Sequence, residues 1–93
     1  MSTEITDNSA RNRYEISLDG DVAGFVEYER GDSALVLAHT EVGSDYEGKG
    51  VGSSLARGVL DDVRAKGLSV VPLCPFIRKW IEKHPDYQDM VAK

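Results

Sequence analysis

Hydrophobic and polar residues alternate in the first half of the chain, which is the period-two pattern of half-buried β-strands. The alternation predicts a strand over residues 14–18, and Asp19-Gly20 then supplies a tight turn. Two further strands are predicted over 22–30 and 34–42, separated by a turn at Gly31-Asp32. The three segments together predict an antiparallel meander.

Strict alternation divides the side chains of each predicted strand between two faces. In segment 22–30, one face is expected to carry Val22, Val26 and Tyr28, opposite Ala23, Phe25 and Glu27. In segment 34–42, one face is expected to carry Leu35, Leu37, His39 and Glu41, opposite Val36, Ala38, Thr40 and Val42. The titratable pair His39 and Glu41 then lies about 7 Å apart along one strand.

The second half of the chain follows a helical period instead. Val51, Leu55, Val59 and Val63 recur every four residues and predict an amphipathic helix that Gly67 is placed to end. The next apolar segment, 68–73, is typical of a strand buried on both faces of a sheet. Because strand, helix and strand form a βαβ unit, the two strands are expected to be parallel, with a right-handed crossover.

A second helix is predicted to begin at Pro75 and to end at His84-Pro85. Its apolar stripe consists of Phe76, Ile77, Trp80 and Ile81. These elements predict a mixed α+β or α/β fold, in which a three-stranded meander leads into a βαβ unit and a C-terminal helix. Trp80 is expected in the core and His84 at the helix end.

The first twelve residues contain only Ile5 as a large apolar group after the initiator, so residues 1–12 are expected to form a loose tail. Residues 13–93 are expected to form one domain. The whole chain has 93 residues, of which 41% are hydrophobic, enough for one core and too few residues for two domains.

Charge and composition narrow the function. Eleven Lys and Arg against sixteen Asp and Glu give a net charge of −5, which disfavours nucleic acid and anionic membranes as partners. No apolar run approaches the roughly 20 residues of a membrane helix. Cys74 is the single cysteine and no metal-ligand spacing links it to His39 or His84, so we expect a cytoplasmic protein without a disulfide or metal site.

A glycine-rich segment, Gly43-Ser-Asp-Tyr-Glu-Gly-Lys-Gly-Val-Gly52, leads into the first predicted helix. Glycine lets the backbone approach a ligand closely, and the free N–H groups of a helix N-terminus bind anions. A Walker-A loop is disfavoured because Gly50 stands where the magnesium-binding hydroxyl is needed. The dinucleotide-binding fingerprint fails because the glycines are spaced Gly-x-Gly-x-Gly and follow the third strand.

The segment from Glu47 to Leu55, after a strand ending His39-Thr-Glu-Val42, resembles the acyl-CoA-binding motif of the GNAT superfamily of N-acetyltransferases. That motif places Arg or Gln, two residues, Gly, one residue and Gly or Ala at a helix start, around the coenzyme's pyrophosphate. Gly50 and Gly52 match its small positions, whereas Glu47 stands where Arg or Gln is usual. The segments 70–76, 80–81 and 84–87 extend the resemblance to the small single-domain GNAT-type proteins.

The resemblance implies a minimal GNAT-like fold with acetyl-CoA or coenzyme A as cofactor. The residues it implies for cofactor binding are Val42, Gly43, Gly48, Lys49, Gly50, Val51, Gly52 and Ser53. Arg57, Arg78 and Lys79 are candidates for the coenzyme's 3′-phosphate, or else solvated helix residues. The backbone N–H of Val42 or Gly43 is expected to bond the pantetheine arm or the thioester oxygen.

Acetyl transfer to an amine needs a general base, and the departing thiolate needs a proton. His39 and Glu41 are the candidate bases, with Glu27 a weaker alternative; each could equally be a structural or solvated strand residue. An unperturbed imidazole has a pKa near 6.5, which favours His39. Cys74 is a candidate nucleophile, an acid for the leaving thiolate, or a small hydrophobic residue.

Two functions therefore remain open at this point. The first is an acetyl-CoA-dependent N-acetyltransferase that acts on a small-molecule or peptide amine by direct attack on the thioester. The second is a non-catalytic acyl-CoA-binding or protein-interaction module on the same fold. The short turns at Asp19-Gly20 and Gly31-Asp32 leave no room for the additional helices that shape the acceptor pocket in longer members of the superfamily.

Overall fold

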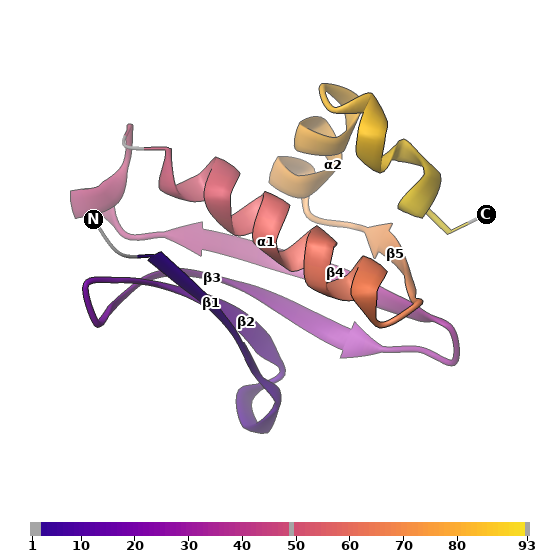
Figure 1. Ribbon diagram of the computed structural model, residues 1–93, viewed down its shortest axis with the longest axis horizontal. Coiled ribbons are helices and arrows are strands. Elements are labelled where there is room, and N and C mark those ends of the chain that lie inside the picture. Colours follow the sequence, from indigo (N-terminus) through magenta and orange to yellow (C-terminus); the bar gives the residue numbers. More distant parts are fainter. Residues whose placement is uncertain (1–2, 49, 93) are drawn as a thin grey trace.

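The structure is a computed structural model that describes residues 3–48 and 50–92. A five-stranded sheet, in the order β1-β2-β3-β4-β5, carries both α-helices on one side (Figure 1). The strands are β1 (Thr3–Asn8), β2 (Arg13–Leu18), β3 (Asp21–Arg30), β4 (Ala34–Val42) and β5 (Ser69–Pro72). The helices are α1 (Val51–Ala65) and α2 (Pro75–Glu82), with short 3-10 turns η1 (Ser9–Arg11), η2 (Ser44–Tyr46) and η3 (Pro85–Met90).

Neighbouring strands from β1 to β4 pair antiparallel, and β4 pairs with β5 in parallel across the α1 crossover. The predicted α+β architecture of a meander, a parallel βαβ unit and a C-terminal helix is confirmed. Helix α1 begins at the predicted Val51, and Gly67 follows its end with a φ of 72°.

The prediction of a loose tail is wrong for residues 3–8, because these residues form β1 and pair with β2 along its whole length. Ile5 explains the difference: its side chain packs on α1 at Gly58, where an added Cβ would lie only 2.4 Å from Ile5 Cγ1. The meander therefore has four strands instead of three. A single apolar residue anchors a strand here because a glycine on a distant helix makes room for it.

Polar side chains also hold β1 in place. Tyr28 Oη donates a hydrogen bond to Asp7, and Lys66 Nζ lies 3.0 Å from Asp7 Oδ2. Lys66 also pairs with Asp62, which accepts a hydrogen bond from Tyr14 Oη. Burial raises the pKa of Tyr14, and the hydrogen bond to Asp62 raises it further. Burial also acts to raise the pKa of Asp62, but the hydrogen bonds from Lys66 and Tyr14 outweigh it, so the pKa of Asp62 is lowered. The cluster thus joins β1, β2 and β3 to α1.

An irregularity in the pairing of β3 with β4 changes which residues of β4 face the helices. Glu27 pairs with His39 but Tyr28 pairs with Leu37, so Ala38 is an extra residue in β4. Such a bulge shifts the alternation by one position. Leu37 faces the helices before the bulge and Thr40 does so after it, and the predicted common face of Leu35, Leu37, His39 and Glu41 is therefore wrong.

The pairing of β2 with β3 has a similar irregularity. Ile16 pairs with Gly24 and Ser17 with Val22, which leaves Ala23 as the extra residue. Ala23 is consequently buried, whereas Val22 is 51% exposed. The prediction that Val22 shares a face with Val26 and Tyr28 is wrong for this reason.

Strands β4 and β5 separate after a short contact. Their pairing runs from Ala34 and Ser69 to Leu37 and Pro72, and the Cys74 N–H then donates to the Leu37 carbonyl at 3.0 Å. Beyond this point β4 is paired with β3 alone. Because both helices lie on one side of the sheet, β5 is not buried on both faces as predicted, and Val71 is only half-buried.

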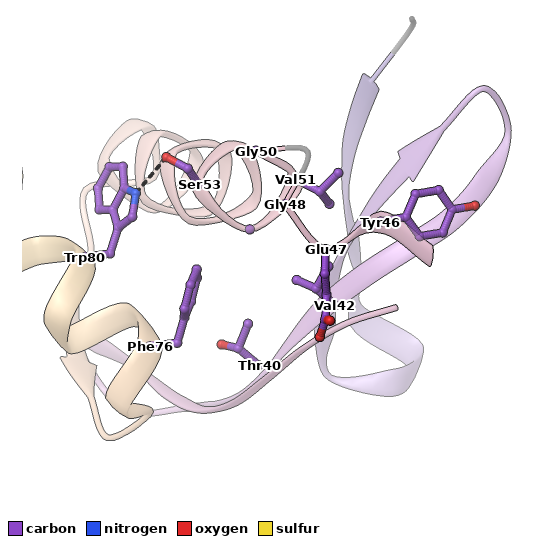
Figure 2. Close-up of a pocket in the computed structure, with 11 residues that line it drawn as sticks. Thr40, Val42, Tyr46, Glu47, Gly48, Gly50, Val51, Ser53, Phe76 and Trp80 are labelled. Atoms are coloured by element: carbon purple, nitrogen blue, oxygen red, sulfur yellow. Dashed lines mark hydrogen bonds between the residues drawn. The ribbon is translucent and has the colours of Figure 1, made fainter. Parts of the chain in front are cut away.

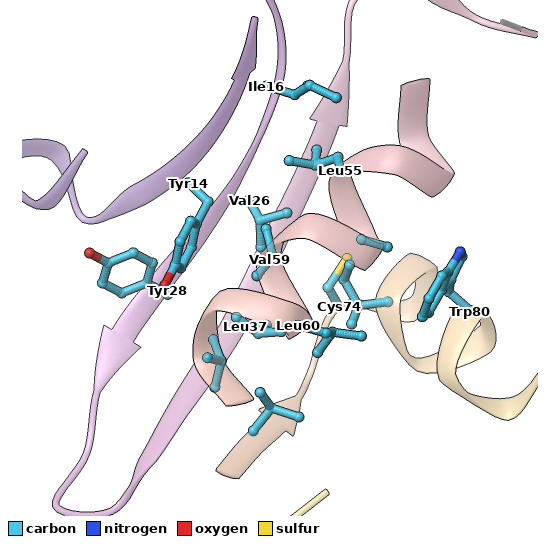
Figure 3. Packing of buried hydrophobic residues seen from close by; sticks show 14 of the residues in the cluster. Tyr14, Ile16, Val26, Tyr28, Leu37, Leu55, Val59, Leu60, Cys74 and Trp80 are labelled. Atoms are coloured by element: carbon cyan, nitrogen blue, oxygen red, sulfur yellow. The ribbon is translucent and has the colours of Figure 1, made fainter. Parts of the chain in front are cut away.

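The core lies between the sheet and the two helices (Figure 3). Helix α1 buries its predicted apolar stripe completely, including Leu55, Val59 and Leu60. Burial of each such side chain contributes about 1.5–3 kcal/mol.

Candidate functional site

A cavity of about 460 Å³ occupies the space where β4 has lost its β5 neighbour. Its walls come from the second half of β4, the loop before α1, the first turn of α1, and α2 (Figure 2). The lining residues are Thr40, Val42, Tyr46, Glu47, Gly48, Gly50, Val51, Gly52, Ser53, Phe76 and Trp80.

The N-terminus of α1 supplies hydrogen-bond donors to this cavity. The first helical hydrogen bond runs from the Ser54 N–H to the Gly50 carbonyl, so the N–H groups of Val51, Gly52 and Ser53 have no acceptor within the helix. Gly50 provides no side-chain cap. Unpaired N–H groups at the positive end of a helix dipole attract anions, and phosphate groups in particular.

Phe76 and Trp80 form the α2 side of the cavity. A Cβ at position 52 would come within 2.9 Å of Phe76 Cζ, so glycine is required there for the ring to lie against α1. Trp80 Nε1 donates to Ser53 Oγ at 2.9 Å, which leaves the Ser53 hydroxyl hydrogen available as a donor. Trp80 is 7% exposed and stacks on His84 at 3.7 Å, so its role in the core is confirmed although one edge lines the cavity.

The backbone of β4 presents peptide groups to the same space. The Gly43 N–H donates to the Ala23 carbonyl at 2.8 Å, towards β3. Because backbone groups alternate along a strand, those of Val42 and Thr40 point away from β3, to the edge that β5 has left. These N–H and C=O groups can bond an amide-containing chain that lies in the cavity.

Six of the eight residues predicted for cofactor binding line the cavity: Val42, Gly48, Gly50, Val51, Gly52 and Ser53. Gly43 does not, and its N–H is engaged by β3, so the expectation that it bonds a ligand there is wrong. Lys49 lies outside the described residues. Thr40, Tyr46 and Phe76 also line the cavity but were not predicted to do so. Phe76 belongs to the predicted apolar stripe of α2, and the sequence did not indicate that an apolar residue in the first turn of that helix faces a cavity instead of the core.

His39 and Glu41 lie on the opposite face of β4 from the cavity. His39 Nε2 is 3.3 Å from Glu41 Oε2, and the side chains are 54% and 61% exposed. The His39 ring lies 6.4 Å from the ring of Phe25, and Glu27 pairs with His39 across the strands. The candidate bases are therefore together and open to solvent.

Cys74 lies on the helix side, where β4 and β5 diverge. Cys74 is 4% exposed, and its thiol donates to Thr40 Oγ1 at 3.1 Å. Strand β4 separates this thiol from His39 and Glu41. The three predicted catalytic side chains thus form a pair on one face and a single buried thiol on the other.

None of the three predicted 3′-phosphate ligands lines the cavity. The Arg57 guanidinium donates to Tyr87 Oη at 3.2 Å and lies over the Trp80 ring. Arg78 lines a separate hollow between β5, α2 and η3, and Lys79 is exposed on α2. The charged side chain that does line the cavity, within the described residues, is the carboxylate of Glu47.

A parallel strand pair that diverges beside a glycine-bordered helix N-terminus defines the acetyltransferase class of fold, and comparison with known proteins agrees. A family model described as GCN5-related N-acetyl-transferase matches residues 13–90, and the chain belongs to this family. Over the described ranges no helix is long and apolar enough to cross a membrane.

Among curated proteins, the chain is similar to Protein NATD1. The human protein is 31% identical over 77 residues, which cover 81% of this chain and 68% of that protein. The chicken protein is 29% identical over 84 residues, covering 88% of this chain and 76% of its own length.

Two solved structures extend the comparison. A GCN5-like candidate N-acetyltransferase from Staphylococcus aureus superposes with a TM-score of 0.72 at 26% identity, covering 96% of this chain and 87% of that one. The ribosomal-protein-S18-alanine N-acetyltransferase from Escherichia coli shares the fold, with a TM-score of 0.58 at 20% identity over 62% of this chain and 38% of that one.

Proposed function

We propose that this protein is an acetyl-CoA-dependent N-acetyltransferase that acts by direct attack of an amine on the thioester, in the reducing cytoplasm. The observation that carries the proposal is the cavity between β4 and α2, where helix N–H groups and free-edge peptide groups meet. Family membership supports the same activity. The chemistry that acetyl-CoA supplies is an activated acetyl group on a thiolate leaving group.

The residues of the cavity suit two parts of this coenzyme, its pyrophosphate and its pantetheine arm. The N–H groups of Val51, Gly52 and Ser53 bind the pyrophosphate at the start of α1. The peptide groups of Thr40 and Val42 bond the amides of the pantetheine arm, as a neighbouring strand would. Phe76 covers the arm with an apolar surface.

The base acts from the other face of the sheet. Because His39 and Glu41 lie on the opposite face of β4 from the cavity, one of them removes a proton from the acceptor amine through water that passes the free edge of the strand. The amine nitrogen forms a bond to the acetyl carbon, the carbon–sulfur bond breaks, and the thiolate leaves with its electron pair and takes up a proton. Cys74 does not itself line the cavity, but its thiol donates to Thr40 Oγ1, which does, so that proton is relayed from Cys74 through the Thr40 hydroxyl.

A non-catalytic acyl-CoA-binding module is the second candidate. Glu47 favours it, because a carboxylate at the cavity is repelled by phosphate groups. The exposure of His39 and Glu41 favours it as well, since neither base is sheltered from water. The transferase and the binding module would use the same coenzyme site, but only the transferase would release coenzyme A in the presence of an amine.

Calorimetric titration with acetyl-CoA tests the shared premise. We expect saturable heat and competition by free coenzyme A; the absence of both up to millimolar ligand contradicts both candidates. A thiol-release assay over a panel of amines then separates them. Amine-dependent release above hydrolysis supports the transferase, whereas binding without release from any amine leaves the module.

A further inference from the structure

The indole of Trp80 holds a serine hydroxyl that lines the cavity proposed to bind the coenzyme. Trp80 Nε1 donates to Ser53 Oγ at 2.9 Å, across the space between α2 and the first turn of α1 (Figure 2). A serine hydroxyl has one proton to donate and two lone pairs that accept. Because the bond from Trp80 occupies a lone pair, the Ser53 proton is directed away from the indole and stays free for another acceptor.

The helix alone would not fix the Ser53 hydroxyl in this way. Ser53 is exposed in the first turn of α1, where a serine side chain can rotate or can donate its proton to a carbonyl of the preceding turn. A hydroxyl that rotates freely loses that freedom when it binds a ligand, and the loss weakens binding. The bond from the neighbouring helix removes part of this loss before any ligand arrives.

Trp80 is a fixed donor because other side chains hold its ring. Trp80 is 7% exposed; its ring stacks on the His84 ring at 3.7 Å, and the Tyr87 ring meets it edge-on at 5.1 Å. His84 is tied back to α2, since its Nδ1 lies 2.6 Å from the Trp80 carbonyl oxygen and donates to it. The Arg57 guanidinium lies over the Trp80 ring at 5.4 Å. Packing therefore sets the direction of the indole N–H.

The Ser53 proton matters because of the other groups at the start of α1. The backbone N–H groups of Val51, Gly52 and Ser53 already lack acceptors within the helix. Glu47, which lines the same cavity, stands where the acyl-CoA-binding motif usually has Arg or Gln, so a side-chain donor to phosphate is missing there. The Ser53 hydroxyl supplies a neutral donor to the same cavity.

We propose that Trp80 is a positioning residue for the pyrophosphate of acetyl-CoA, because it holds Ser53 so that the serine hydroxyl donates to a phosphate oxygen. The proposal rests on the proposed coenzyme site and not on turnover. It gives the indole a role that another large apolar ring cannot fill, since the ring must donate a hydrogen bond. A hydrogen bond to a charged group is stronger than one between neutral groups, so its loss is measurable as a loss of coenzyme affinity.

A double-mutant cycle on the full chain, with acetyl-CoA affinity measured by calorimetry, tests the proposal. Ser53→Ala should weaken binding about tenfold, and Trp80→Phe, which keeps a ring but removes the donor, about fivefold. In the Ser53→Ala chain, Trp80→Phe should change the affinity by less than about twofold, because the hydroxyl that it positions is already absent. Additive effects of the two substitutions overturn the proposal.

Acetyl-pantetheine, which has the thioester arm but no phosphate, separates positioning from packing. Trp80→Phe should leave its affinity, measured by competition, unchanged, whereas a collapsed cavity would weaken both ligands; equal losses for the two ligands contradict the proposal. Tyr87→Phe is the matched control, because it removes a hydroxyl beside Trp80 that does not contact Ser53. If Trp80→Phe does not fold, Ser53→Ala decides alone, with the fluorescence of Trp80, the single tryptophan, as the binding signal. Affinity equal to that of the parent chain then overturns the proposal.

Thiol release in the presence of amines, measured separately, distinguishes failure of this proposal from failure of the proposed function. Coupling between Trp80 and Ser53 in acetyl-CoA binding, without release from any amine, supports the positioning role and rejects the transferase. Amine-dependent release together with an additive cycle rejects the positioning role alone. Absence of acetyl-CoA binding to the parent chain rejects both.

Discussion

The two halves of β4 are similar in length but differ in their pairing and burial. Ala34–Leu37 lies between β3 and β5, and Leu35 and Leu37 are buried at 3% and 0% exposure. After the bulge at Ala38, residues 39–42 pair with β3 alone, and Ala38, His39 and Glu41 are exposed. The first half holds the fold together, whereas the second presents a strand edge and two faces to ligands.

The difference arises from where β5 stops. Pro72 ends the pairing with β4 and Pro75 begins α2, and proline contributes no N–H to a strand ladder. The chain therefore turns into a helix while β4 continues for five residues. Two prolines close together in the sequence thus set the length of strand edge that a ligand can occupy.

The largest expected effect concerns stability. Leu37→Ala should lower the free energy of unfolding by about 2–5 kcal/mol, because it leaves a cavity in a fully buried position. Val42→Ala, four positions beyond the bulge, should cost under about 1.5 kcal/mol, because its side chain is only half-buried beside an existing cavity. Urea denaturation of both variants makes the comparison, and equal losses would show that the two halves do not differ in this way.

Much of the fold could be predicted from periodicity, because β2 to β5, α1 and α2 carry regular apolar patterns. Strand β1 could not be predicted in this way, because its one large apolar side chain, Ile5, packs at Gly58 and its Asp7 pairs with the distant Lys66. These contacts join residues more than fifty positions apart. A polar segment with one isoleucine is indistinguishable from a tail until the partner is known.

The candidate site was predicted unevenly for a related reason. The glycine motif is local in the sequence, and with the adjoining end of β4 it predicted six residues that line the cavity. The faces of β4 on which Thr40 and His39 lie depend instead on the bulge at Ala38. Segment 34–38 is apolar at every position, so alternation carried no sign of the extra residue. The glycine-bordered side of the cavity could thus be predicted from a motif, whereas the faces of β4 required knowledge of the strand register.

The next effect concerns only the cavity proposed to bind the coenzyme. Gly52→Ala should weaken acetyl-CoA binding about tenfold, because its Cβ would displace the Phe76 ring into the cavity. Ser54→Ala is the control, an exposed serine in the same turn that does not line the cavity. Calorimetry compares the two; retention of full affinity in Gly52→Ala would mean that the ring does not border the coenzyme.

A smaller effect is expected at Glu47. Glu47→Gln should tighten acetyl-CoA binding about 3- to 5-fold at low salt, because it removes a negative charge beside the proposed phosphate site. Asp45→Asn removes a nearby exposed charge that does not line the cavity and should change affinity less. If both variants bind equally well across a salt series, only the overall charge matters and Glu47 has no specific position near the phosphates.

The smallest expected effect is at the Cys74 thiol, which lies where β4 and β5 diverge. Cys74→Ala should keep amine-dependent coenzyme A release within about threefold of the parent chain, because direct attack needs no thiol nucleophile and water can protonate the thiolate. It should cost about 1 kcal/mol of stability, since it removes the hydrogen bond to Thr40. Thiol release and urea denaturation measure the two quantities. Complete loss of turnover, with acetyl-CoA binding and folding intact, would replace direct attack with a covalent acetyl-cysteine route and would move the chemistry to the helix side of the sheet.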